Sequence, residues 1–163
     1  MISPGEVRKA AKKKERENLR FRSFLKNHAD DEELDREFAA LHQELFEGYD
    51  CSQCTNCCQA YSTVLDENEI TDISNFLGMT AEPFREKYVA QGEEGPELDA
   101  PCAFLQSDGR CRIESCKPRQ CCDYPYTDKP GRFFSLYSIL TSAEHCPVVY
   151  EILERLKKMY HFR

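Results

Sequence analysis

The stretch Cys51-Ser-Gln-Cys54-Thr-Asn-Cys57-Cys58 places four cysteines within eight residues. Two cysteines separated by two residues lie on a tight turn that can bring both sulfur atoms to one metal ion. A third cysteine at the same interval gives the spacing of bacterial-type iron–sulfur loops, in which a further cysteine is followed by proline. Cys146-Pro147 has that form. The stretch therefore predicts a thiolate metal centre that shapes the fold around it.

A second group of cysteines follows about fifty residues later, in a segment broken by prolines and glycines. Its members are Cys102, Cys111, Cys116, Cys121 and Cys122. We expect residues 102–131 to be irregular and shaped by their ligands. For Cys116 and Cys122 the alternative of a small buried hydrophobic side chain stays open. The predicted metal ligands are Cys51, Cys54, Cys57, Cys58, Cys102, Cys111, Cys121 and Cys146.

Composition favours a soluble metal-binding protein in a reducing compartment. The chain has ten cysteines in 163 residues and shows no export signal at its N-terminus, so we expect a cytoplasmic protein whose thiols bind metal. The longest uncharged stretch, 133–143, is too short to span a bilayer. A net charge of -7 disfavours general nucleic-acid binding.

Charge and apolar patterning predict a mostly α fold with two parts. Residues 1–49 should form an N-terminal helical hairpin, with a helix from Ser3 towards Lys26 and a second from Asp30 to Glu47. The first segment is basic and the second acidic, which fits antiparallel packing and leaves a surface for a protein partner. Residues 50–163 should form the cysteine-cluster domain, which ends in a helix.

Within the second part, helix signals alternate with breaks in the pattern. Helices are predicted over 66–77 and from Thr80 to Tyr88, followed by an acidic loop over 91–101. Residues 132–140 fit either a strand or the start of a helix. Pro147 begins an amphipathic C-terminal helix. The expected architecture is about five helices around an irregular, cysteine-lined core.

The cysteine blocks and their neighbours resemble a known family. The motifs are Cys51-x2-Cys54-x2-Cys57-Cys58, the segment from Asp66 to Tyr88, Pro101-Cys102-Ala-Phe-Leu, Asp108-Gly-Arg-Cys111-Arg-Ile, Lys117-Pro-x2-Cys121-Cys122-Asp-Tyr-Pro and the late Cys146. Together they resemble the CxxCxxCC cysteine-cluster family of zinc- or iron-chelating domain proteins over residues 50–147. The resemblance implies metal chelation and names no reaction. This chain departs from the family at Glu114, where tyrosine is usual, and at Lys117 and Cys122, where arginine is usual.

Three functions compete on this sequence. The favoured one is a [4Fe–4S] cluster on Cys51, Cys54, Cys57 and Cys146, with a redox or cluster-dependent role. Cys58 could replace Cys57 in that set. The alternative is a Zn²⁺-binding structural or interaction module without catalysis. A disulfide-stapled protein is the least favoured, and no residue identifies a catalytic group.

A thiolate metal site is anionic, so nearby cations are expected to offset its charge. The candidates are Arg110, Arg112, Lys117, Arg119, Lys129 and Arg132.

Overall fold

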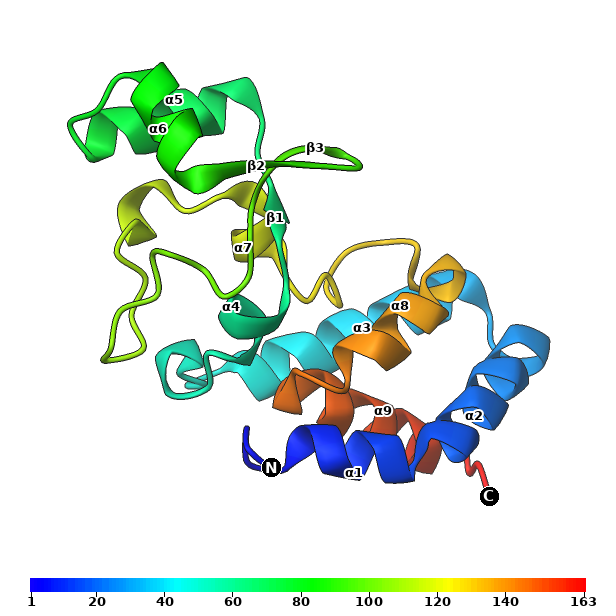
Figure 1. The fold of residues 1–163 in the computed structure, drawn as a ribbon. Helices are drawn as coiled ribbons and strands as arrows, with labels where there is room; N and C mark the ends of the chain where they lie inside the picture. The colour runs from blue at the N-terminus through cyan, green and yellow to red at the C-terminus, as the bar shows by residue number, and fades with distance from the viewer. The chain divides into compact units, whose positions relative to one another are not determined.

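The computed structural model describes residues 1–163 and is mostly helical, with one three-stranded sheet (Figure 1). The predicted mostly α fold class is confirmed. Nine α-helices are present instead of about five, because one long predicted helix is split and several are single turns between cysteines. Contacts divide the chain into unit 1, residues 1–49 and 125–163, and unit 2, residues 50–124. No helix is long and apolar enough to cross a membrane.

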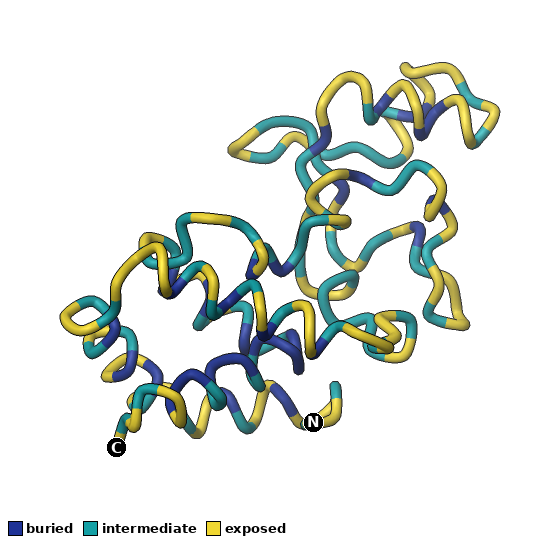
Figure 2. The backbone as a smooth tube through the Cα atoms, turned by 180° about the vertical axis from the view of Figure 1, so that it is seen from behind, coloured by how far each residue is buried: buried dark blue, intermediate teal, exposed yellow.

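Unit 1 is a bundle whose apolar stripes face one another. Its elements are α1 (Val7–Lys13), α2 (Glu15–His28), α3 (Asp31–Phe46), the 3₁₀ turn η3 (Arg132–Phe134), α8 (Leu136–Ser142) and α9 (Pro147–Met159). Helix α9 packs against α1, α3 and α8, and α2 packs against α8. Phe21, Phe38 and Ile152 are completely buried in this unit. Figure 2 shows buried positions recurring along these helices, as expected for amphipathic helices around one core.

The N-terminal segment differs from the predicted hairpin in two ways. The helix expected to run to Lys26 is interrupted at Lys14, whose φ of -99° and ψ of 7° are not helical. The main partner of α3 is α9 rather than α2. The physical reason is that α9 buries five apolar residues between Val148 and Leu156, whereas α2 buries only Phe21 and Leu25.

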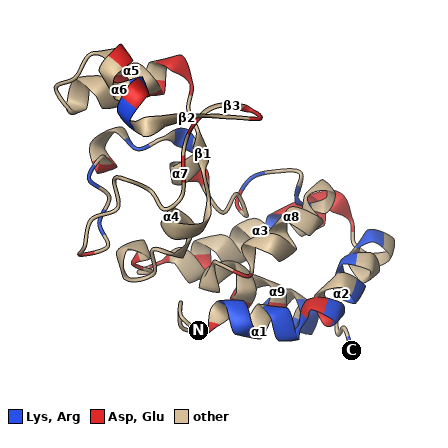
Figure 3. Ribbon diagram, in the orientation of Figure 1, with Lys and Arg blue, Asp and Glu red and all other residues tan.

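Residues 125–163 therefore group with residues 1–49, whereas the predicted domain division placed them with the cysteine cluster. Ion pairs between helices also stabilise unit 1. Lys157, only 5% exposed, donates to Glu17 at 2.5 Å and to Glu154 at 2.7 Å, and so ties α9 to α2. Figure 3 shows that Lys and Arg residues recur along α1 and α2.

Unit 2 combines short helices with a small sheet. Its elements are the 3₁₀ turn η1 (Cys51–Gln53), α4 (Asn56–Ala60), β1 (Thr63–Val64), α5 (Glu67–Phe76), α6 (Ala81–Tyr88), β2 (Val89–Gly92), β3 (Gly95–Leu98), the 3₁₀ turn η2 (Glu114–Cys116) and α7 (Arg119–Asp123). The strands are antiparallel in the order β1-β3-β2. Asp66 begins α5 with a reciprocal capping box to Glu69, and the helix ends before Gly78, where φ is +66°.

The prediction of an acidic loop over 91–101 is wrong in part. Residues 89–98 form a β-hairpin whose register pairs Gly92 with Gly95. Glycines at the turn make the reversal sterically accessible, since Gly95 has a φ of +130°. The segment 132–140, left open between strand and helix, is helical. Residues 102–131 contain only short helical turns, as expected.

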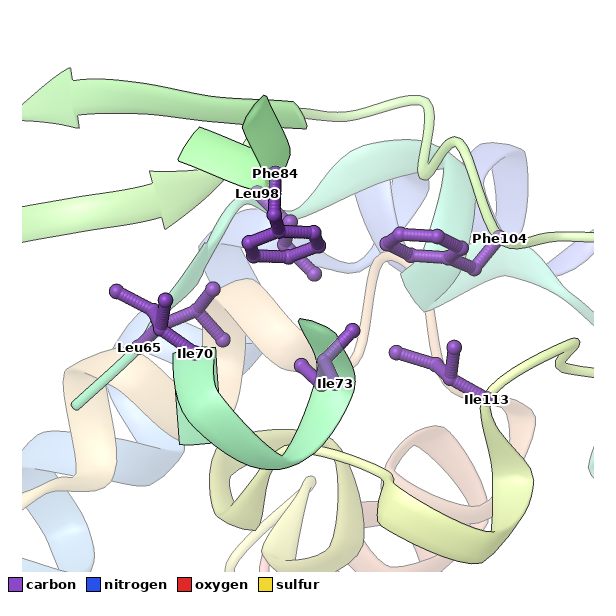
Figure 4. Close-up of a cluster of buried hydrophobic side chains, with 7 residues drawn as sticks. All are labelled: Leu65, Ile70, Ile73, Phe84, Leu98, Phe104 and Ile113. Atoms are coloured by element: carbon purple, nitrogen blue, oxygen red, sulfur yellow. The ribbon is translucent and has the colours of Figure 1, made fainter. Parts of the chain in front are cut away.

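The apolar core of unit 2 is small. Figure 4 shows Ile70 and Ile73 on one face of α5, with Phe84, Leu98, Phe104 and the remaining members of the cluster around them. Cys102, Cys111 and Cys116 are partly buried against this cluster. The cysteine loops therefore border the core without being enclosed by it.

Gly109 holds two cysteine-bearing loops in close contact. Its φ is +87°, and a Cβ atom built there would lie 1.9 Å from the backbone oxygen of Ser52. No other side chain fits, because both the backbone conformation and the space favour glycine. The turn at 106–110 thus rests directly on the first cysteine loop.

We predict that Gly109→Ala destabilises unit 2 far more than Gly78→Ala. Both glycines have positive φ, so each change costs about 1 to 2 kcal/mol of backbone strain. Gly78 has open space around its Cβ position, whereas Gly109 must displace Ser52, which adds about 1 to 3 kcal/mol. Urea unfolding followed by circular dichroism measures both. Equal losses of unfolding free energy would contradict the close contact.

Candidate metal centre

The first cysteine loop is a tight turn followed by one helical turn. Asp50 accepts hydrogen bonds from the backbone N–H and the hydroxyl of Ser52, at 2.9 and 2.7 Å. The carbonyl of Cys51 accepts from the backbone N–H groups of Cys54 and Thr55, both at 3.0 Å. Thr55 then adopts a left-handed conformation, with φ at +59°, and starts α4. The tight turn predicted from the spacing is present.

The adjacent cysteines of α4 differ in their surroundings. A hydrogen bond between the thiols of Cys57 and Cys58 lowers the pKa of Cys58 to about 6, against the opposing effect of burial. The ammonium group of Lys117 acts in the same direction. Because the thiolate is the form that binds metal, Cys58 is available as a ligand at neutral pH.

The second group of cysteines is held by donors to sulfur. The backbone N–H groups of Phe104 and Leu105 hydrogen-bond the thiol of Cys102, and that of Ile113 hydrogen-bonds the thiol of Cys111. Burial raises the pKa of Cys102, Cys111 and Cys121, and these hydrogen bonds oppose it. Backbone amides that point at sulfur stabilise a thiolate in the way that charge-assisted hydrogen bonds do.

Cys121 has a donor that the sequence did not reveal. The hydroxyl of Thr63, on β1, lies 3.3 Å from its sulfur. Thr63 and Cys121 are 58 positions apart, and no local pattern connects them. β1 packs directly against α7, where the backbone N–H of Val64 also donates to the side-chain oxygen of Gln120 at 3.0 Å.

The two cysteine groups meet at Cys58. Its charge interacts with those of Cys51, Cys102 and Cys121, and the backbone N–H of Cys102 donates to the Cys58 carbonyl at 2.9 Å. Cys111 interacts in turn with Cys102. Unit 2 therefore gathers seven of the eight predicted ligands: Cys51, Cys54, Cys57, Cys58, Cys102, Cys111 and Cys121.

One cation serves this thiol group. The half-buried ammonium of Lys117 interacts with the thiols of Cys51, Cys58, Cys111 and Cys121. It also pairs with Glu114 at 3.5 Å. Of the other expected cations, Arg119 has a side chain that is 87% exposed.

The remaining three cysteines have different environments. Cys116 packs against the apolar cluster, near Ser115 and Asp72, which fits the small hydrophobic alternative. Cys122 is exposed, and its thiol lies 3.7 Å from the carbonyl of Lys117. Cys146 is buried in unit 1 at the start of α9, and its assignment as a ligand stays a prediction.

The chemistry of this donor set fits zinc or iron. Unit 2 has no histidine, so its donors are thiols, the ligands that select zinc and iron–sulfur clusters. No disulfide bond joins any of the ten cysteines. No three Cys, His, Asp or Glu side chains stand at coordination geometry. Binding therefore requires the sulfur atoms to converge further on the metal.

Comparison with known proteins agrees with this chemistry. No solved structure matches the chain significantly. A family model named CxxCxxCC, described as "Putative zinc- or iron-chelating domain", matches residues 50–147, which is more than half of the chain. The match includes all of unit 2 and extends into unit 1 as far as Cys146-Pro147. The chain therefore belongs to the CxxCxxCC family of zinc- or iron-chelating domains.

Proposed function

We propose that this metal-chelating protein carries a [4Fe–4S] cluster on the first cysteine loop and uses it in a redox or cluster-dependent role. The supporting observation is the η1–α4 turn, which presents Cys51, Cys54 and Cys57 in the order and spacing of an iron–sulfur loop. Cys146, followed by Pro147, is the fourth ligand that the same pattern predicts. When bound, such a cluster would accept and release single electrons.

The protein's own residues would hold the cluster and balance its charge. The Asp50 cap fixes the start of the loop, and Gly109 packs the neighbouring turn onto Ser52. Lys117 offsets part of the thiolate charge, which stabilises the anionic site. Cys51 is exposed, so the loop lies at the surface, where a partner could exchange electrons with it.

A partner of acidic character is part of this proposal. Arg8, Lys9, Lys12 and Lys13 are exposed along α1 and its surroundings, in a chain whose total charge is negative. A local basic surface of this kind attracts acidic proteins at low ionic strength. We place the protein in a reducing compartment, because the proposed ligands must stay thiolates.

The second candidate function is a zinc-binding structural module. It is favoured by the small apolar core of unit 2, on which Cys102 and Cys111 border directly. A structural zinc ion contributes folding free energy to such domains. In that case the metal would stabilise the loops and carry no electrons.

Anaerobic purification of the full chain distinguishes the two candidates. We predict brown protein with about four iron and four acid-labile sulfide per chain, the composition of one [4Fe–4S] cluster. Iron and sulfide analysis, zinc analysis and visible absorption provide the measurement. Zinc without sulfide and without visible absorption would overturn the iron–sulfur assignment and support the structural module.

The metal content of single variants distinguishes cysteines that bind metal from cysteines that only pack against the apolar core. We predict that Cys54→Ser abolishes iron and sulfide binding, because serine oxygen is a poor ligand for iron–sulfur clusters. Cys116→Ser is the matched control and keeps full metal content, since this thiol lies against the apolar cluster. Metal loss in Cys116→Ser as complete as in Cys54→Ser would show that the assignment of roles is wrong.

A further inference from the structure

We propose that Cys58, Cys102, Cys111 and Cys121 form a second metal centre, which binds one divalent transition-metal ion, such as Zn²⁺, through four thiolates. This inference rests on the proposed function in one respect, namely that the chain binds metal through thiolates. It does not depend on whether the first loop takes an iron–sulfur cluster or zinc.

The number of thiols in unit 2 exceeds what one centre binds. A tetrahedral ion or a [4Fe–4S] cluster uses four cysteine ligands. Unit 2 alone gathers seven thiols, and three of these belong to the iron–sulfur pattern of the first loop. The four that remain are Cys58, Cys102, Cys111 and Cys121, and four thiolates are the number that one tetrahedral ion binds.

The contacts of Cys58 associate it with Cys102 and Cys121. It follows Cys57 directly on α4, and successive side chains of a helix point about 100° apart. Its carbonyl accepts the backbone N–H of Cys102 at 2.9 Å, so the backbones of the two ligands are already joined. Its charge interacts with those of Cys102 and Cys121.

The other three ligands come from a turn and a helix fixed by hydrogen bonds. Cys102 and Cys111 flank a reversal of the chain, closed by the bond from Arg112 N–H to the Phe104 carbonyl at 2.8 Å and by a bridge between Leu105 and Cys111. Cys121 lies on α7. An ion bound here would connect α4, this turn and α7.

Three of the four sulfurs, those of Cys102, Cys111 and Cys121, already have a hydrogen-bonding partner in place. Backbone amides serve Cys102 and Cys111, and the Thr63 hydroxyl serves Cys121. Such outer contacts orient metal ligands, and their loss typically costs 10- to 100-fold in affinity. By contrast, Cys116 lies near Asp72 and the apolar cluster and takes no part in this set.

Lys117 fits the charge of this second site. Four thiolates and one divalent ion sum to a charge of about -2. The ammonium group interacts with the thiols of Cys58, Cys111 and Cys121, three of the four proposed ligands. A single cation beside the site reduces the repulsion that the four sulfurs would otherwise experience.

The test compares metal content in three variants of the full chain, purified without oxygen from cells supplied with iron and zinc. We expect Cys102→Ser to lose about one metal ion per chain and to keep whatever the first loop binds. Cys54→Ser should do the reverse, and Cys116→Ser should match the wild type. Loss of all metal together in both Cys54→Ser and Cys102→Ser would overturn the second centre, because a single shared site would then explain the data.

The outcome also separates this inference from the proposed function. Wild-type protein without sulfide, but with two zinc ions lost independently in the two variants, would refute the iron–sulfur assignment and support the second centre. Wild-type protein with four iron, four sulfide and no further metal would support the cluster and overturn the second centre.

A spectroscopic measurement covers the case in which Cys102→Ser does not fold. Metal-free wild-type protein is titrated with Co²⁺, and the Cys111→His variant is titrated in parallel. Histidine is itself a good ligand, so this variant should still bind two ions, with the visible bands of one shifted by the exchange of sulfur for nitrogen. Identical Co²⁺ spectra in the two proteins would overturn the assignment of Cys111.

Discussion

Mutual repulsion among closely spaced thiolates is the constraint on which unit 2 depends. Seven of the predicted ligands lie in this unit, and the ammonium group of Lys117 interacts with the thiols of four of them. One ammonium cannot balance several thiolates, so the thiols whose pKa is raised stay protonated at neutral pH without metal, namely Cys51, Cys102, Cys111 and Cys121. Burial is the largest cause of the raised pKa of Cys102, Cys111 and Cys121, and the charges of neighbouring cysteines raise it further. A bound metal reverses the balance, because it converts repelling thiolates into ligands that attract a common centre.

The two units differ in what else stabilises them. Unit 1 has long amphipathic helices, a core that includes Phe21, Phe38 and Ile152, and the buried ion pairs of Lys157. Unit 2 has a core of seven buried apolar residues and long stretches without regular structure. Hydrophobic burial can account for the first, and we propose that the loops of the second depend on the additional free energy of metal binding. The departures at Glu114 and Lys117 from the usual family residues fall beside the thiols, and there the two side chains pair with each other.

Sequence reasoning succeeded where the determining interactions are local. The cysteine spacing fixed the first loop, Asp66 and Glu69 fixed the start of α5, and Pro147 fixed the start of α9. It failed where contacts between distant segments decide. The β-hairpin at 89–98 depends on strand pairing, and the Thr63–Cys121 contact depends on the packing of β1 against α7. The packing of α3 on α9, in place of the predicted hairpin, depends on which of several apolar faces buries more surface.

Hydrogen exchange with and without metal tests the central claim most directly. The chain is kept reduced and free of oxygen, and the exchange of amide hydrogens is followed by mass spectrometry on peptides from both units. If metal orders unit 2, its removal should speed exchange in the segments 51–60 and 102–124, including the sulfur-bonded amides of Phe104 and Ile113, while α3 and α9 stay protected. Unchanged protection of those segments in fully metal-free protein would contradict the claim, since unit 2 would then be held by its apolar core alone.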